Sequence, residues 1–188
     1  MQQVILASQS PRRKQLLEQA EIEFMVLTAH TDEDFPSDMN KEEVPLFIAR
    51  NKAQAVWQQR KDGIIIAADT VVILDNQIIG KPVDEADARR ILKNLSGRTH
   101  CVITGAVIQS AERVLDIREK TEVTFRVLTD SQIAHYIKRY QPFDKAGAYA
   151  IQEWIGLIGI EKINGDFYNV MGLPISRITE GLKSFIEP

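Results

Sequence analysis

The chain has 188 residues, and its 23 Lys and Arg side chains against 26 Asp and Glu give a formal net charge of −3 at pH 7. Its 44% hydrophobic and 26% charged residues are typical of a soluble globular protein, and the length predicts one domain, 1–188, with two lobes. Without a basic excess to attract a phosphate backbone, a general nucleic-acid binder is excluded, whereas a small, highly charged anion stays open as a ligand.

In the first half of the chain, strand and helix patterns alternate. A buried strand over Val4–Ala7 leads to a helix start at Ser10-Pro11, because Ser can cap a helix and Pro is favoured at its first position. A second strand over 24–27 and an acidic loop over 28–40 are expected next. Asn40 with Glu43 resembles a capping pair, and a second helix is expected to follow it to about Arg60. A continuously apolar strand over 64–68 and a hairpin over 71–79 come after it.

The second half continues the alternation. A helix is expected over 84–95, followed by two long strands over 100–109 and 114–127. A capping box starts a helix over 129–140, a hairpin turn is expected at 164–165, and a last helix begins at 174. Because hairpins interrupt the alternation of strands and helices, we expect an α/β fold with a mixed, twisted sheet flanked by helices rather than a uniform series of parallel units.

The sequence also bears on where the protein works. Its single cysteine, Cys101, excludes an intramolecular disulfide and any cysteine-built metal site. The first nine residues lack the basic and long apolar segments of a signal peptide, and the most apolar segment, 64–74, contains Asp69 and is too short to span a bilayer. We therefore expect a cytoplasmic protein that has neither a membrane nor a nucleic acid as a partner.

The segment from Ala7 to Arg13 is the first candidate site. A strand ends there, Ser8 and Ser10 follow, and a helix N-terminus opens beside Arg12 and Arg13. Unpaired N–H groups and the helix dipole attract an anion, and guanidinium groups match phosphate oxygens. The alternative is that Ser10 only caps the helix and that both arginines are solvated.

A carboxylate after an apolar strand is the second candidate. Asp69 follows the strand expected over 64–68, and α/β proteins place ligands at the carboxyl ends of strands. A buried carboxylate needs a cation or a metal to compensate the cost of desolvation. The alternative is a capping or turn Asp before Thr70.

Separated lysines and one glutamine complete the candidates. Lys52, Lys81 and Lys145 gain weight only together, because a lone Lys is usually a solvated surface residue. The small residues of 144–152 let a backbone approach a ligand closely, and Gln152 offers both an acceptor and donors. A tight strand entry explains that segment equally well.

Taken together, these motifs resemble the Maf family of nucleotide pyrophosphatases. The resemblance is carried in order by 6–13, 68–72, 80–82, 96–100, 144–149 with Gln152, and 169–174, which span nearly the whole chain. It implies a two-lobed α/β fold with a central cleft, similar to inosine triphosphate pyrophosphatases. It also implies cleavage of nucleoside triphosphates to the monophosphate and pyrophosphate with a divalent cation, Mg²⁺, Mn²⁺ or Co²⁺.

The resemblance also implies roles for individual residues. Asp69 is the expected general base, and Lys52 and Lys81 act with it as catalytic cations on the phosphates. Glu33 and Asp69 are the expected metal ligands, although Asp32 and Asp34 flank Glu33 and could substitute for it. The expected substrate-binding residues are Ser8, Ser10, Arg12, Arg13, Thr70 and Gln152.

Substrate choice follows from three of these positions. Arg12, Thr70 and Gln152 resemble the branch that acts on dTTP and UTP, and a Gln amide can pair with both the N3–H and a neighbouring carbonyl of uracil or thymine. Modified pyrimidine nucleotides stay open as substrates, and the resemblance makes a homodimer reasonable. The competing hypotheses are a non-catalytic nucleotide-binding regulator of cell division and septum formation, and a phosphomonoesterase.

Overall fold

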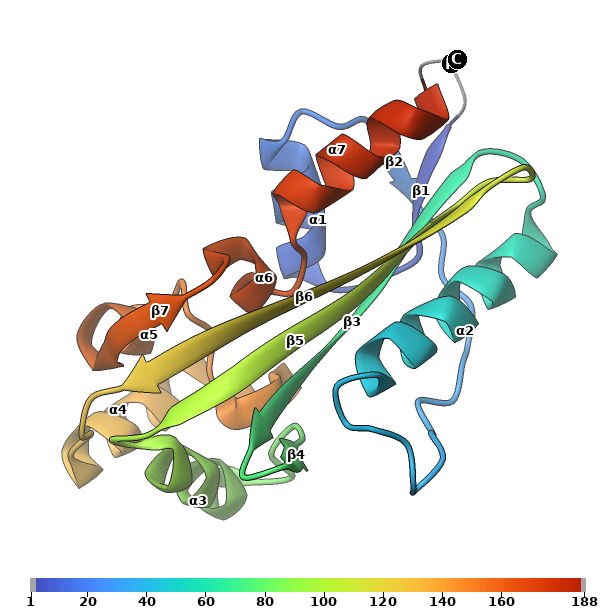
Figure 1. Cartoon of the computed structure of the whole chain (residues 1–188). Coiled ribbons are helices and arrows are strands. Elements are labelled where there is room, and N and C mark those ends of the chain that lie inside the picture. The colour runs from blue at the N-terminus through green and yellow to red at the C-terminus, as the bar shows by residue number, and fades with distance from the viewer. Residues whose placement is uncertain (1–2, 187–188) are drawn as a thin grey trace. The chain divides into compact units, whose positions relative to one another are not determined.

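A seven-stranded mixed sheet organises the computed structural model, which describes residues 3–186 (Figure 1). The strand order is β2-β1-β3-β5-β6-β7, with β4 paired to β3. β1 pairs in parallel with β2 and β3, whereas β3–β4 and β6–β7 are antiparallel. The strands are β1 Val4–Leu6, β2 Phe24–Val26, β3 Ile64–Leu74, β4 Gln77–Ile79, β5 Thr99–Gln109, β6 Val114–Phe125 and β7 Ile160–Asn164. The predicted α/β class with a mixed sheet is confirmed.

Helices connect the strands. They are α1 Pro11–Gln19, α2 Val44–Gln59, α3 Glu85–Leu95, α4 Asp130–Tyr140, α5 Trp154–Gly159, α6 Phe167–Met171 and α7 Ile175–Ile186, with short 3₁₀ turns η1 Pro142–Asp144 and η2 Ala146–Ala148. The capping box of Thr129 and Gln132 is present as predicted. The short helices α5 and α6 were not predicted. Within residues 3–186, no helix has the length and apolar character needed to cross a membrane.

The chain divides into two compact units. The first unit contains the chain up to Thr70, Thr104–Glu119 and the chain from Gly172 on, and the second contains Val71–Ile103 and Lys120–Met171. The long strands β3, β5 and β6 therefore contribute residues to both units.

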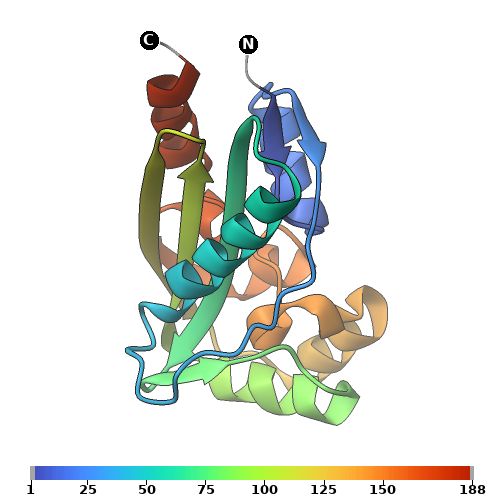
Figure 2. The same cartoon turned by 90° about the vertical axis from the view of Figure 1, so that its right-hand side faces the viewer.

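In the first unit, alternate residues of the strands pack against α2. Ile5 and Ala7 of β1 and the following turn, and Ile65 and Ala67 of β3, form one core cluster with the α2 residues Ala49, Ala53 and Val56. Figures 1 and 2 show α2 on one face of these strands and α1 and α7 on the other. Because successive residues of β3 point to opposite faces, each later residue of the strand faces either α2 or the side of α1 and α7.

In the second unit, a tight hairpin joins β3 to β4. Asp75 and Asn76 both have positive φ, 50° and 60°, which is the conformation of a two-residue type I′ turn. The hairpin predicted over 71–79 is thereby confirmed. A core cluster of Val72, Val102 and Val123 packs beneath it.

Two local predictions were wrong. The segments 64–68 and 71–74 were expected as separate strands, but β3 is continuous through Asp69, because a polar pair in a long apolar segment does not end a strand whose pairing continues. Asn164-Gly165 was expected to be a hairpin turn, but β7 ends at Asn164 and α6 begins at Phe167, with Gly165 at φ 129° making the change of direction.

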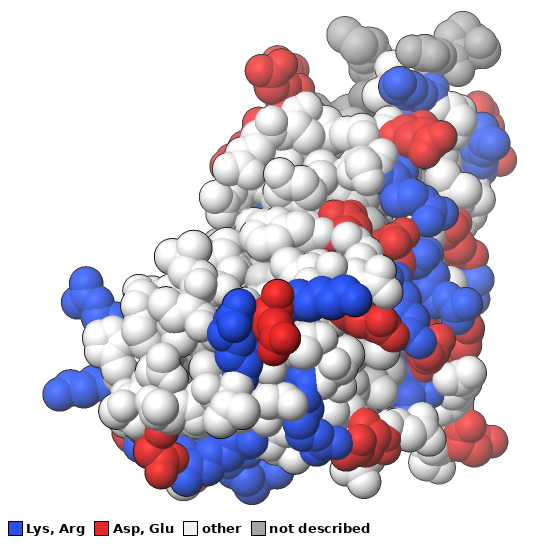
Figure 3. All heavy atoms as spheres, turned by 60° about the vertical axis from the view of Figure 1, so that its left-hand side comes forward, with Lys and Arg blue, Asp and Glu red and all other residues white. Residues whose placement is uncertain are grey.

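Charged side chains of both signs are interleaved on the surface. Figure 3 shows Lys and Arg beside Asp and Glu on one face, with uncharged areas around them. Ion pairs within the first unit, such as Arg50 with Asp116 and Arg177 with Glu119, have the same mixed character. The face in Figure 3 therefore has no continuous basic surface of the kind that binds nucleic acid.

Candidate active site

Asp69 and Lys52 form the centre of the candidate site in the first unit. Asp69 continues the alternation of Ile65 and Ala67, so it points to the α2 side of the sheet. Lys52 lies on α2, three residues after the buried Ala49. Its ammonium donates to Asp69 Oδ1 at 2.7 Å, and the two side chains are 17% and 14% exposed. The helix and the strand therefore bring a largely buried carboxylate and its cation together.

The same ammonium reaches the acidic loop. Lys52 Nζ also donates to Glu33 Oε1 at 2.7 Å, so that one cation bridges two carboxylates. Asp32, which flanks Glu33, is instead 85% exposed and lies 3.9 Å from His30. Glu33 therefore lies closer to Asp69 through this shared ammonium, whereas Asp32 is turned toward solvent.

Arg13 occupies the opposite face of β3. Thr70 follows Asp69 and so points to the α1 side, where Arg13 Nη2 donates to its hydroxyl at 3.1 Å. Arg13 Nη1 donates to Ser8 Oγ at 3.1 Å and Nε donates to the carbonyl of Gly172 at 2.8 Å. Burial lowers the pKa of Arg13 from its usual value, and the nearby carboxylate of Asp69 opposes that shift. This buried guanidinium joins three distant segments of the chain.

The loop after β1 is arranged around Ser8. Its hydroxyl is buried and accepts from the backbone N–H of Ser10 at 3.2 Å as well as from Arg13. Ser10 occupies the N-cap position of α1, but its side chain makes no capping hydrogen bond, which corrects the alternative reading of Ser10 as a side-chain cap. Ser10 and Arg12 belong to this same loop and first turn.

The residues fit an oxygen-liganded divalent cation only when a substrate completes the site. Within residues 3–186, no three His, Cys, Asp or Glu side chains are grouped so that they could hold a metal ion by themselves. Glu33 and Asp69, however, both reach one position, that of Lys52 Nζ. Mg²⁺ is commonly held by one or two carboxylates together with substrate phosphates and water. Two carboxylates are therefore a sufficient protein contribution.

The second unit carries the other two predicted residues. Lys81 is exposed and follows Gly80, whose carbonyl accepts from the N–H of Gly147 at 3.1 Å. Gln152 is also exposed and lies directly before α5. The backbone hydrogen bond between Gly147 and Gly80 therefore joins the segment that carries Lys81 to the segment that leads to Gln152.

Sequence reasoning gave Lys145 little weight and missed its partners. Lys145 is buried, and its ammonium lies 2.7 Å from Asp144 Oδ1 and 3.6 Å from Glu153 Oε1. Glu153 in turn accepts a hydrogen bond from the hydroxyl of Tyr136. No local pattern marks these contacts, although the small residues around Lys145 were a signal that this segment packs closely.

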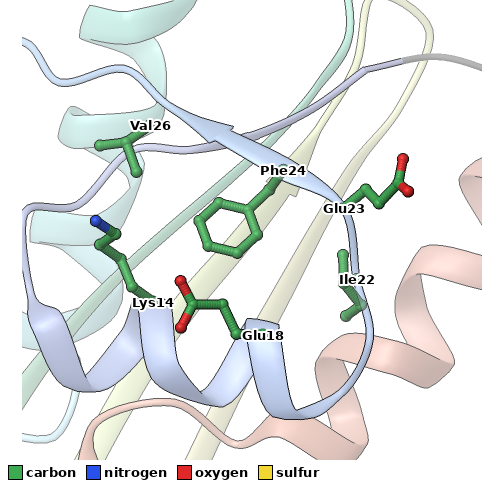
Figure 4. Close-up of a pocket in the computed structure, with 6 residues that line it drawn as sticks. All are labelled: Lys14, Glu18, Ile22, Glu23, Phe24 and Val26. Carbon is green, nitrogen blue, oxygen red and sulfur yellow. The ribbon is translucent and has the colours of Figure 1, made fainter.

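A separate pocket of about 430 Å³ lies between α1 and β2 in the first unit. It is lined by Lys14, Glu18, Ile22, Glu23, Phe24 and Val26. Figure 4 shows the Phe24 ring directed toward α1 between these side chains. None of the candidate residues lines this pocket, so it is not part of the site.

A comparison of the sequence with protein-family models and with known proteins gives matches that cover the segments that carry the motifs. The family model described as Maf-like protein matches residues 3–185. Proteins named dTTP/UTP pyrophosphatase are similar over nearly the full length. One from Cytophaga hutchinsonii is 46% identical, covering 98% of this chain and 85% of that protein. One from Phocaeicola vulgatus is 48% identical, covering 96% and 94%.

Among solved structures, a HAM1 protein from Coxiella burnetii is similar over 66% of this chain and 73% of that chain, with a TM-score of 0.46 and 19% identity. A likeness at this level does not decide the fold, and the α/β assignment rests on the strand order itself.

Proposed function

The chain belongs to the Maf family, and on that premise we propose that it hydrolyses dTTP and UTP to the monophosphate and pyrophosphate. The observation that carries the chemistry is the largely buried Asp69 carboxylate held by Lys52. The names of relatives at 46% and 48% identity support the choice of substrates. Modified pyrimidine triphosphates belong to the same substrate class.

Asp69 acts as the general base in this proposal. One of its carboxylate oxygens accepts from Lys52, which fixes the orientation of the group. The carboxylate takes a proton from a water molecule that attacks the α-phosphorus. The bond from the α-phosphorus to the oxygen bridging to the β-phosphorus then breaks, and pyrophosphate leaves with the electron pair of that bond.

Cationic and hydroxyl groups stabilise the charge that moves onto pyrophosphate. Ser8, Ser10, Arg13, Lys52 and Lys81 are the proposed phosphate contacts. The hydrogen bonds of Arg13 use one N–H of each nitrogen, so each terminal nitrogen has a second N–H to direct elsewhere. Arg13 therefore positions Ser8 and Thr70 and also contributes a fixed positive charge.

Glu33 and Asp69 are the proposed ligands of a divalent metal, Mg²⁺, Mn²⁺ or Co²⁺. When bound, the metal supplies neutralisation of the negative charge on the triphosphate. The two carboxylates that share Lys52 are the groups that would hold it.

Arg12, Thr70 and Gln152 are the proposed specificity residues. The Gln152 amide accepts from N3–H of uracil or thymine and donates to a neighbouring carbonyl. The Thr70 hydroxyl is hydrogen-bonded to Arg13 and to Thr104 Oγ1, at 3.1 and 2.9 Å. These two hydrogen bonds support a fixed orientation of the Thr70 hydroxyl.

A cytoplasmic location and a homodimer complete the proposal. Cell fractionation tests the first, and sedimentation of the purified protein tests the second. A monomer at the concentrations used for activity would remove the homodimer from the proposal without affecting the chemistry assigned to Asp69.

The variant Asp69→Asn tests the proposed chemistry. Turnover should fall by about 10²–10⁴-fold, because the amide cannot take the proton, while nucleotide binding is retained. Pyrophosphate and orthophosphate are measured separately with a panel of nucleoside triphosphates and monophosphates in the presence of Mg²⁺ or Mn²⁺. The exposed Asp38→Asn variant is the control for loss of a carboxylate in the same unit.

Each outcome of this panel has one meaning. Undiminished pyrophosphate release by Asp69→Asn contradicts the role of Asp69. Tight binding of dTTP or UTP by the wild-type protein without turnover supports the regulator. Orthophosphate released from monophosphates indicates a phosphomonoesterase.

A further inference from the structure

In the second unit, a buried lysine is paired with Glu153, the residue that directly follows the proposed base-reading Gln152. Lys145 is 7% exposed, and its ammonium lies 2.7 Å from Asp144 Oδ1 and 3.6 Å from Glu153 Oε1. A buried ammonium is strongly destabilising unless it is paired with a negative charge. Both carboxylates therefore hold Lys145 in place, and Lys145 in turn holds Glu153, whose side chain is 22% exposed.

The second oxygen of Glu153 is anchored to α4. The hydroxyl of Tyr136 donates to Glu153 Oε2, and the oxygen of that hydroxyl accepts from the backbone N–H of Ala150 at 3.1 Å. Tyr136 is completely buried, so its ring is fixed by the core. One hydroxyl thus ties Ala150 and Glu153 to the same point of the helix.

Gln152 lies between these two attachments. Ala150 is fixed two residues before it and Glu153 directly after it, while the intervening Ile151 is buried. Glu153 is also the N-cap residue of α5, and its carbonyl accepts from the N–H of Gly156 at 2.9 Å. A backbone held on both sides fixes the position from which the exposed Gln152 side chain extends, and a base-reading amide needs such a fixed starting point.

We propose that Glu153 is a positioning residue for Gln152 and that, through its contacts with Lys145 and Tyr136, it sets the affinity for uracil and thymine nucleotides. This inference rests on the proposed function, in which Gln152 reads the base. Glu153 does not touch the substrate. It holds the backbone of Gln152 so that ordering this segment costs no binding free energy.

The test is a double-mutant cycle with UTP as substrate. Glu153→Gln removes the charge that pairs with Lys145 and keeps the size of the side chain. The KM for UTP should rise about five- to tenfold with kcat changed less than about twofold, because binding and not the reacting phosphates is affected. In a Gln152→Ala background the same Glu153→Gln change should have no further effect on KM.

Two further variants sharpen the result. Tyr136→Phe removes only the hydroxyl that holds Glu153 and should raise the KM for UTP in the same way. If Glu153→Gln does not fold, Tyr136→Phe takes its place in the cycle with Gln152→Ala. Glu161→Gln, an exposed residue of β7, is the matched control and should leave KM unchanged. Thermal unfolding of every variant is recorded, so that loss of folded protein is separated from a rise in KM.

The inference is overturned if the effects of Glu153→Gln and Gln152→Ala on KM simply add, or if kcat falls while KM is unchanged. Failure of the proposed function has a different signature, since the wild-type protein then releases no pyrophosphate from UTP. In that case the same four proteins of the cycle are compared by their Kd for UTP. Additive changes in Kd, or no change, reject the positioning role.

Discussion

Asp69 places a carboxylate in the middle of a strand whose preceding residues, from Ile64 to Ala68, are completely buried. The free energy cost of that position is offset by one ammonium, because Lys52 projects from α2 toward the same face of the sheet. Since Lys52 also binds Glu33, it holds two like charges close together. At the scale of single residues, the candidate site is thus a pair of carboxylates held by one cation.

Replacement of Lys52 by Met tests this arrangement. Without the ammonium, the carboxylates of Glu33 and Asp69 repel each other and the phosphates lose a cation, so kcat/KM for UTP should fall by about 10²-fold or more. Steady-state pyrophosphate release measures the loss. Lys61→Met, at an exposed position of the same unit, should behave like the wild type, and equal activity of the two variants would exclude the proposed role.

His100 makes stability depend on pH. Burial lowers its pKa from 6.5 to about 4, and its Nε2 is hydrogen-bonded to the hydroxyl of Tyr149 at 2.7 Å. Between pH 6.5 and 4 the imidazole of His100 is protonated in the unfolded chain but neutral in the folded chain. Stability therefore falls as the pH drops below about 6.5 and levels off near 4. This group alone should cost roughly 2 kcal/mol between pH 7 and pH 4.5.

The variant with His100→Phe and Tyr149→Phe isolates that contribution. Replacing both partners leaves no buried hydroxyl without a hydrogen bond. Urea unfolding at pH 7 and 4.5 should show a loss of stability about 2 kcal/mol smaller in the double variant than in the wild type. Equal losses in both proteins would assign the acid sensitivity to other groups.

The position of α2 depends on a close approach to β5. A Cβ built at Gly105 would lie 2.2 Å from the backbone nitrogen of Leu46, so only glycine permits this contact. The contact seats the helix that carries Lys52 over the strand that carries Asp69. At the scale of elements, the site is positioned by the backbone packing of α2 on the sheet.

Gly105→Ala should therefore disturb both stability and activity. We expect the free energy of unfolding to fall by about 1–3 kcal/mol or more, because the added Cβ would collide with backbone atoms of α2 that cannot move aside as a flexible side chain can. Chemical unfolding measures it, and kcat for UTP should fall as α2 shifts. Gly80→Ala, where a Cβ would meet nothing within 4 Å, should stay within about 0.5 kcal/mol of the wild type in stability. Equal stability of the two variants would show that α2 tolerates the shift.

The net charge of the whole molecule is −3, but it does not show how charged side chains are paired within each unit. Each unit pairs its functional charges internally, with Lys52 between Glu33 and Asp69 in the first and Lys145 between Asp144 and Glu153 in the second. Within residues 3–186, no three His, Cys, Asp or Glu side chains are grouped into a site that could hold a structural metal ion by themselves. Folding and metal-dependent activity should therefore be separable.

Metal removal tests this separation. Chelation with EDTA should abolish pyrophosphate release, because the charge of the triphosphate is no longer neutralised, while the Tm changes by no more than about 2 °C. Restoring Mg²⁺ or Mn²⁺ should restore turnover. A large fall in Tm on chelation would instead indicate a structural metal.

The sequence by itself determined the type and order of the main elements and the segments that carry the chemistry. Caps, turn residues and apolar periodicity act over a few residues, which is why the capping box at Thr129 and the hairpin at Asp75-Asn76 were predictable. The family resemblance rested on the same local segments, and it pointed to Asp69 and Gln152 although β3 continues past Asp69.

Only the tertiary structure decided which of these residues meet. Lys52 is 17 and 19 residues from its two carboxylates, and Arg13 is 159 residues from Gly172. Such pairings depend on how helices pack on strands, so no local pattern distinguishes Glu33 from Asp32. For the same reason, the link from Tyr136 to Glu153 became visible only after α4 had packed against the segment that leads to Gln152.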